Sequence, residues 1–357
     1  MNANEALRAR GVAHAVYLER YKSSVWKRIA ALLDKADAEL VVQLQKRAAR
    51  SALTEYRLEL LLKAVRDLNA AAMKRFRAAL REELRGLAGY ELDYQLRALR
   101  DAVPPGLETR VEFVAPAART VYAAAITKPF QGRVLRDWAR GLERSRYEKA
   151  AAAIRLSVIE GEPIALTVQR LRGTRARRYQ DGVLAVTRRE AEAVSRTAIN
   201  HVVTKARDTL FAENGDVVKG WQFVATLDSR TTARCASLDG KVFKVGEGPT
   251  PPQHINCRSV TIPVLKSWRE LGIDRDEVPA GTRASMNGQV AATETYGEWL
   301  RKQPAAVQEE ALGKAKARLF RDGGLTVDRF AAPTGRAYTL DELRAREARA
   351  FEKAGVE

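Results

Sequence analysis

The sequence predicts a mainly α-helical fold of the α+β type, in which one small β-rich module interrupts a chain of helices. The first observation is that no proline occurs before Pro104, where glycine is also sparse, so that little breaks a helix. The second is that apolar residues recur there every three to four positions, the spacing of a helix with one apolar face. The third is a change after Gly215 to alternating apolar and polar residues, which is typical of strands.

The N-terminal hundred residues are expected to form an extended helical part. We expect helices over residues 16–44, 58–84 and 92–102, the second of them ended by Gly86 and Gly89. The helical spacing is clearest at Leu58, Leu61, Leu62, Val65 and Leu68. This apolar stripe either docks against other helices of an assembly or packs within an internal bundle, and the sequence leaves both interpretations open.

A second helical region follows the first break, Pro104-Pro105-Gly106. We expect helical structure over residues 117–159, interrupted at Pro129, and a further helix over residues 183–213. Asn214-Gly215 is a typical helix end and closes this region.

The β-rich module is expected over residues 216–264. Residues 221–225 have strand spacing, and the dipeptide Asp239-Gly240 is typical of a tight hairpin turn. Residues 257–262 alternate again and predict a strand that stops at Pro263. Helical spacing then resumes and continues to the end of the chain, with breaks at Gly323-Gly324 and Pro333. The expected regions are therefore a helical N-terminal part at 1–103, a helical region at 104–215, the β module at 216–264 and a helical tail at 265–357.

Composition limits the class of protein. The chain has 357 residues, 46% of them apolar and 30% charged, which is typical of a soluble folded protein of two or three domains. No apolar run approaches the ~20 residues of a membrane-spanning helix, and no signal segment is visible. Two cysteines indicate a protein made in a reducing cytoplasm.

The positive charge is concentrated in one part of the chain. Of the formal net charge of +18, residues 1–200 carry most, with 38 Lys+Arg against 23 Asp+Glu, whereas residues 201–300 are neutral. The densest run holds Arg170, Arg172, Arg175, Arg177 and Arg178. Such a run is either a solvated surface or a nucleic-acid contact, and the regional excess favours a polyanionic partner.

The sequence lacks the common motifs of catalysis. It contains no phosphate-binding loop, no dinucleotide-binding glycine motif and no nucleophile elbow. The histidines are His14, His201 and His254, and only His254 lies near a cysteine, Cys257. We therefore predict that the protein is not an enzyme and has no small-molecule substrate.

Cys235, His254 and Cys257 fall within 23 positions, separated by turn-forming residues. Three interpretations stay open at this point. The cysteines can be buried as small apolar side chains while His254 donates to a carbonyl. The three can instead bind a structural zinc ion, with Asp228, Asp239 or water as the fourth ligand, or the cysteines can form a disulfide.

Around these residues the chain resembles the phage head morphogenesis, or minor head, proteins typified by phage Mu protein F. The resembling positions are Asp228, Arg230, Thr231, Cys235, Asp239, Gly240, Pro252, His254, Asn256, Cys257 and Arg258. The family motif commonly closes with Cys-Arg-Cys, whereas this chain has Cys257-Arg258-Ser259, so the thiolate that would be the fourth ligand is missing. The resemblance covers about residues 150–264 and implies that these residues serve packing at least as much as metal binding.

The resemblance implies a minor capsid protein inside the virion head near the portal, acting in head morphogenesis, DNA packaging or ejection. Its expected partners are the portal protein, a major capsid or scaffolding protein, and packaged genomic DNA bound without sequence preference, with no membrane contact. Two alternatives remain at this point. One is a non-specific DNA-binding protein, and the other is a small metal-dependent nuclease that uses His254 and Asn256.

Overall fold

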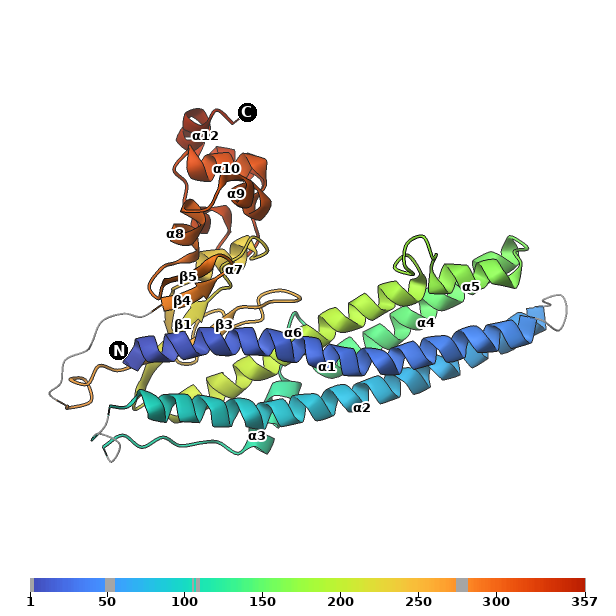
Figure 1. Ribbon diagram of the computed structural model, residues 1–357, viewed down its shortest axis with the longest axis horizontal. Coiled ribbons are helices and arrows are strands. Elements are labelled where there is room, and N and C mark those ends of the chain that lie inside the picture. The colour runs from blue at the N-terminus through green and yellow to red at the C-terminus, as the bar shows by residue number, and fades with distance from the viewer. Residues whose placement is uncertain (1–2, 49–54, 105, 107–109, 274–281, 357) are drawn as a thin grey trace. The chain divides into compact units, whose positions relative to one another are not determined.

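A computed structural model describes residues 3–48, 55–104, 106, 110–273 and 282–356 (Figure 1). Its helices are α1 (Ala3–Ala48), α2 (Glu55–Ala102), α3 (Ala118–Thr127), α4 (Leu135–Ile159), α5 (Ile164–Arg172), α6 (Val183–Glu213), α7 (Ala233–Leu238), α8 (Tyr296–Arg301), α9 (Ala305–Leu312), α10 (Lys314–Arg321), α11 (Leu340–Arg346) and α12 (Ala348–Ala354), with a short 3-10 helix, η1 (Val327–Phe330). Its strands are β1 (Val218–Val224), β2 (Val242–Lys244), β3 (Val260–Leu265), β4 (Thr282–Ser285) and β5 (Gly288–Ala291). The prediction of a mainly α fold is confirmed, and the strands form two small sheets, β2-β1-β3 and β4-β5.

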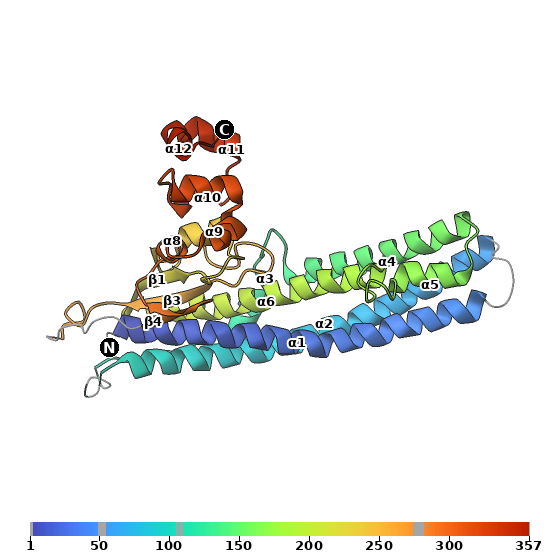
Figure 2. The same cartoon turned by 45° about the horizontal axis from the view of Figure 1, so that its top comes forward.

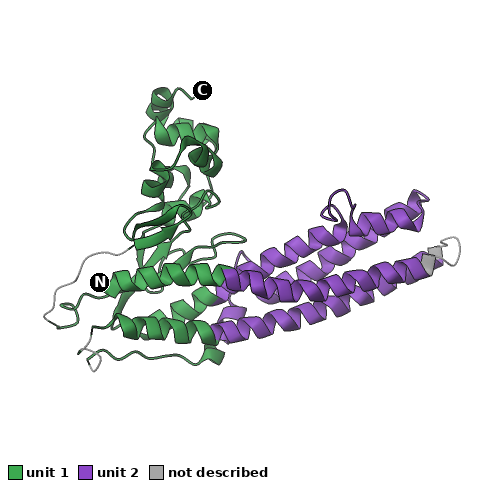
Figure 3. Ribbon diagram, in the orientation of Figure 1, with its two compact units in different colours: residues 1–19, 89–121, 203–357 green, residues 20–88, 122–202 purple. Residues whose placement is uncertain are grey.

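The chain divides into two compact units (Figure 3). Unit 1 comprises residues 1–19, 89–121 and 203–357, and unit 2 comprises residues 20–88 and 122–202. The long helices α1, α2 and α6 each contribute residues to both units. The boundaries of the four consecutive regions expected from the sequence remain predictions.

The regular secondary structure among the described residues of unit 2 is helical, apart from an isolated β-bridge between Phe130 and Arg133. Within it α1 and α2 run side by side (Figures 1 and 2), joined by hydrogen bonds from Tyr21 and Arg28 to the Glu83 carboxylate at 3.0 and 2.7 Å. Its core holds Leu40, Leu44, Leu61, Leu62, Val65, Ala150, Ala151, Ile154, Leu171 and Leu184. The apolar stripe of α2 is therefore covered inside the unit, which decides in favour of the internal-bundle interpretation.

Helix α2 continues through both glycines that were expected to end it. Gly86 is exposed and a side chain there would meet nothing within 4 Å, while Gly89 lies against Ala118 of α3. A glycine inside a helix costs only about 1 kcal/mol relative to alanine. Buried residues on both sides of Gly86, Leu84 and Leu87, hold the helix together across it.

The sheet of unit 1 has the order β2-β1-β3 and is antiparallel throughout. Strand β3 runs past Pro263, which pairs opposite Trp221, so the expected strand end at that proline is wrong. Because β3 is bonded to one strand only, a residue without an N–H group is tolerated at this edge. Asp239-Gly240 is also not a hairpin turn: it follows helix α7, and the Gly240 N–H donates to Phe223 O at 2.9 Å.

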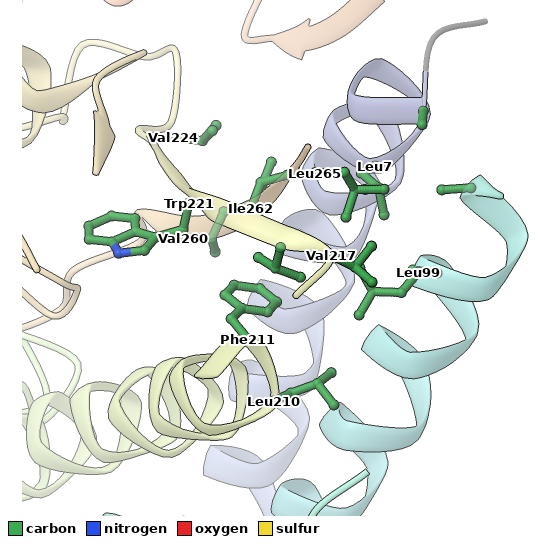
Figure 4. Packing of buried hydrophobic residues seen from close by; sticks show 14 of the residues in the cluster. Leu7, Leu99, Leu210, Phe211, Val217, Trp221, Val224, Val260, Ile262 and Leu265 are labelled. Atoms are coloured by element: carbon green, nitrogen blue, oxygen red, sulfur yellow. The ribbon is translucent and has the colours of Figure 1, made fainter. Parts of the chain in front are cut away.

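The core of unit 1 joins this sheet to three helix ends (Figure 4). Trp221, Val260 and Ile262 of the sheet pack in one cluster with Leu7 of α1, Leu99 of α2, and Leu210 and Phe211 of α6. Helix α1 approaches β3 so closely at Gly11 that an added Cβ would lie 2.7 Å from Ile262 Cδ1. Only a glycine fits this contact without displacing the isoleucine.

The C-terminal part of unit 1 adds a second cluster. The hairpin β4–β5, which the sequence reasoning missed, precedes the short helices α8 to α12 (Figure 2). Their shared core holds Leu227, Ala236, Tyr296, Trp299, Leu300, Leu319, Phe320, Leu325, Val327, Phe330, Leu343, Ala350, Phe351 and Ala354. The expected breaks at Gly323-Gly324 and Pro333 separate helices here, as predicted.

Candidate functional site

The motif region begins with an ion pair between the loop after β1 and the start of β3. Arg258 donates from both terminal nitrogens to the Asp228 carboxylate, through Nη2 to Oδ1 at 2.8 Å and through Nη1 to Oδ2. Thr231 Oγ1 donates to Thr226 O at 2.5 Å, and the exposed Arg230 contributes its backbone N–H to Asp228. Burial raises the pKa of Asp228, but Arg258 outweighs it and leaves this pKa below its usual value.

Asp239 is the second fixed point of the motif. Its carboxylate accepts the Ala225 N–H and the Tyr296 N–H, both at 2.7 Å, and it is fully buried. Arg283 of β4 donates both terminal nitrogens to it at 3.1 and 3.3 Å. Asp239 thus ties the end of β1 to the β4–β5 hairpin and to helix α8, and sequence reasoning missed Arg283 because it lies 44 positions away.

The two cysteines and His254 meet in space. Cys235 Sγ lies 3.4 Å from His254 Nε2 and 3.8 Å from Cys257 Sγ. All three ligand atoms are within 4.8 Å of one another, and both cysteines are buried and are not joined by a disulfide. Helix α7, capped by Thr232, presents Cys235, while the loop before β3 presents the other two.

Hydrogen bonding fixes the orientation of the imidazole. His254 Nδ1 lies 2.8 Å from Ile255 O, and because a carbonyl only accepts, Nδ1 is the protonated nitrogen of this contact. Nε2 therefore faces Cys235 with its lone pair when the ring is neutral. The hydrogen bond to Cys257 raises the pKa of His254, and hydrogen bonds from Cys235 and from His254 lower the pKa of Cys257.

Two of the three separations fit the edges of a tetrahedral zinc site. Zinc–ligand bond lengths imply about 3.8 Å between two sulfurs and about 3.6 Å between sulfur and nitrogen. The observed separations are 3.8 and 3.4 Å. Ser259 hydrogen-bonds to Cys235 from the place in the sequence where the resembling family commonly has its third cysteine. A hydroxyl is a poor zinc ligand, so if zinc binds here Cys235, His254 and Cys257 would hold it and a fourth ligand would have to come from water.

A buried ionic triad supports β3 from the helical side, and sequence reasoning missed it. Glu91 of α2 lies 2.7 Å from His14 Nε2 of α1 and accepts from Arg207 Nε of α6 at 2.7 Å. Arg207 Nη1 also donates to Thr261 O at 2.6 Å. Burial raises the pKa of Glu91, but Arg207 and His14 outweigh it and bring this pKa to about 2.

The remaining motif residues have different surroundings. Pro252 is buried, whereas Asn256 is exposed with a positive φ of 60°, a conformation that asparagine tolerates. Among the described residues, the Cys235–His254–Cys257 group is the one His, Cys or acid cluster able to hold a metal. His254 thus faces two thiols and lacks the acidic metal ligands that a nuclease site would need.

The arginine run at 170–178 lies in α5 and the loop after it. Arg170 is neutralised by Glu160 and Glu162, which the chain brings to it from the turn before α5. Arg172 covers the Tyr179 ring at 4.5 Å. Arg175, Arg177 and Arg178 are exposed, so the run retains less free charge than its sequence implies.

The comparisons with known proteins agree with the motif. Residues 131–262 match the family model described as Phage Mu protein F like protein. This match confirms the predicted resemblance over these residues and supports a phage head-related protein. No curated protein and no solved structure gives a significant match to the chain. None of the described helices has both the length and the hydropathy needed to cross a membrane.

Proposed function

We propose that this protein is a minor head protein that sits inside the virion near the portal and acts in head morphogenesis, DNA packaging or ejection. The observation that carries the proposal is the match of residues 131–262 to the Phage Mu protein F like family. The surroundings of the motif agree with a structural role, because Asp228, Asp239 and Cys257 bind other parts of the same unit. Both cysteine sulfurs are buried, so neither is open to a substrate.

The expected partner is another helical head protein, and the portal protein is the first candidate. Helix α2 begins and helix α4 ends at the same end of unit 2 in both views (Figures 1 and 2). Exposed apolar side chains belong to these two helix ends and to the neighbouring helix α5. They are Tyr56, Leu60, Leu156, Ile159 and Leu166. Ile159 is 81% exposed, which is unusual for so large an aliphatic side chain in a free protein. Major capsid or scaffolding protein is the second candidate for this surface.

Co-expression with the portal protein tests the proposal. We expect the two to co-purify and purified virions to contain the chain by mass spectrometry. Leu156→Asp with Ile159→Asp should abolish co-purification, because buried carboxylates would oppose the contact. Val242→Asp, at a residue of similar exposure in β2, is the matched control and should bind normally. A chain that ignores the portal and is missing from virions would contradict the proposal.

Deletion of residues 1–100 is not a clean test of docking. Leu7 and Leu99 are part of the core of unit 1, and Leu40 and Leu61 are part of the core of unit 2. Removing this segment would unfold both units, so any loss of binding would be uninformative. Point substitutions at exposed residues are therefore the appropriate variants.

A further inference from the structure

A basic groove lies between α2 and α4, entirely within unit 2. It has a volume of about 580 Å³ and is lined by Arg66, Asn69, Arg77, Arg81, Arg136, Arg140, Glu143, Arg144 and Tyr147. Six arginines thus surround a single glutamate. The residues come from two stretches about 60 positions apart, so no run of basic residues in the sequence marks the groove.

Contacts across the groove show how the two helices form it. Arg77 Nη1 pairs with Glu143, and Asn69 Nδ2 donates to Glu143 O at 2.9 Å. Arg66 donates to Tyr147 OH at 3.0 Å and lies over its ring. These contacts hold Arg66 and Arg77 against the wall of the groove. The ion pair with Arg77 also neutralises Glu143, the acidic residue among the described lining residues.

The other four arginines keep their charge available. Arg136 and Arg140 are each 65% exposed and share one acid, Asp137, at 3.6 and 3.9 Å. Among the described residues, neither Arg81 nor Arg144 has an acidic partner within 4.0 Å, and both are exposed. Arg136, Arg140 and Arg144 follow one another at intervals of four, so they lie on one face of α4.

We propose that this groove, the arginine groove, binds the phosphate backbone of duplex DNA without sequence preference. The choice of duplex DNA as the polyanion rests on the proposed function, whereas the phosphate-binding site itself is inferred from the arginines of the groove. Guanidinium groups bind phosphate oxygens in bidentate fashion and remain charged at every relevant pH. Among the described residues, the acids that pair with the arginines of the groove are Glu143 and the neighbouring Asp137. The arginines outnumber these two acids, so the groove keeps a net positive charge.

The dimensions and lining of the groove favour a backbone contact. Residues 66–81 of α2 span about 22 Å at 1.5 Å per residue, which equals about six phosphates of one strand at 3.4 Å each. Single-stranded binders add aromatic stacking platforms, but the one aromatic side chain among the described lining residues, Tyr147, is already covered by Arg66. The groove thus suits phosphates and offers no readout of bases.

Salt-dependent binding of the full chain to two unrelated duplexes of 24 base pairs tests this proposal by fluorescence anisotropy. The variant Arg81→Ala/Arg136→Ala/Arg140→Ala/Arg144→Ala should flatten the slope of log K against log salt by about three to four units, since each contact contributes about 0.9. The matched control removes the same charge elsewhere, at Arg172, Arg175, Arg177 and Arg178, and should keep most of the slope. The lysine version of the groove variant should retain most of the slope, because it keeps the charges.

Several results would overturn the proposal. They are an unchanged slope in the groove variant, an equal or larger loss in the control, or a marked preference for one duplex. Equal competition by oligoglutamate would assign the groove to an acidic protein segment instead. Circular dichroism checks that the variants fold. If the quadruple variant does not fold, the double variant Arg136→Ala/Arg140→Ala, which changes exposed positions alone, should show half of the change in slope. Virion incorporation and portal binding are measured separately, so failure here leaves the proposed function standing.

Discussion

The two units use arginine in opposite ways. In unit 1, Arg207 and Arg283 are buried and each donates to a buried carboxylate, Glu91 or Asp239. In unit 2, the arginines of the groove are mostly exposed and outnumber the acids around them. Among its described residues, unit 2 has one buried pair of its own, Arg146 with Asp37.

This difference separates charge that holds the fold from charge that meets a partner. A buried arginine is costly unless its carboxylate is present, so its position is set by the structure around it. An exposed arginine contributes little to stability and remains free to bind phosphate. We therefore expect substitutions in unit 1 to change stability and substitutions in the arginine groove to change binding.

The largest effect is expected from Glu91→Ala. Its removal leaves Arg207 buried without a counter-charge, which costs about 3–5 kcal/mol. Denaturant unfolding, together with hydrogen exchange at the amides of β3, measures the loss. Glu143→Ala in unit 2 breaks a partly exposed pair and should cost less than about 1 kcal/mol. Equal losses in the two variants would contradict the comparison.

Acid should destabilise unit 1 through the same carboxylate. Glu91 has a pKa of about 2 in the fold against 4.5 when unperturbed, despite its burial, because Arg207 and His14 face it. A lowered carboxyl pKa stabilises the fold above the unfolded value, and this stability is lost as pH falls from about 4.5 to 2. The shift corresponds to about 3 kcal/mol. Unfolding followed at several pH values checks this, and Glu91→Gln should flatten the dependence in that interval.

The sulfur cluster is expected to contribute a smaller amount. His254→Ala should destabilise the sheet region by about 1–3 kcal/mol, through lost hydrogen bonding or lost metal binding. Elemental analysis of protein purified without chelator distinguishes the two, and a zinc signal abolished by Cys257→Ser supports metal binding. Ser259→Cys adds a third thiolate, and so a fourth ligand, beside Cys235 and should increase zinc retention in either case. No gain in retention would argue against the tetrahedral arrangement.

Gly11 tests how tightly α1 packs on the sheet of unit 1. Gly11→Val should destabilise this unit by about 1–3 kcal/mol, because the new side chain would overlap Ile262. Thermal unfolding measures the change. Ile262→Ala should relieve part of the strain in the double variant, and a double variant no better than the single one would contradict the stated cause.

The smallest effect is a gain in unit 2. Gly86 is helical, exposed and has open space at its Cβ position. Gly86→Ala should stabilise the chain by about 0.5–1 kcal/mol, since alanine loses less backbone entropy on forming the helix. A rise in the unfolding temperature checks the prediction, and a fall would show that the glycine has a packing role.

Local sequence patterns were sufficient for much of the fold. The helix expected at residues 183–213 is α6 with the same bounds, and Asn214-Gly215 follows its last residue. The strands near 221–225 and 257–262 also occur, displaced by a few residues. These elements depend on periodicity and on chain breakers, which act within a few residues and can be seen in one sequence.

Contacts between distant residues decided the rest. Gly86 stays helical because its flanks are buried, and Pro263 lies in a strand because that strand is at a sheet edge. The partner of Asp239 and the two walls of the arginine groove come from segments more than 40 positions apart. The sequence alone determined the helices, the β module and the Cys/His motif, since these depend on neighbouring residues. Only the tertiary structure determined which charges are paired and which stay open, because burial and pairing depend on packing between segments that the sequence does not place side by side.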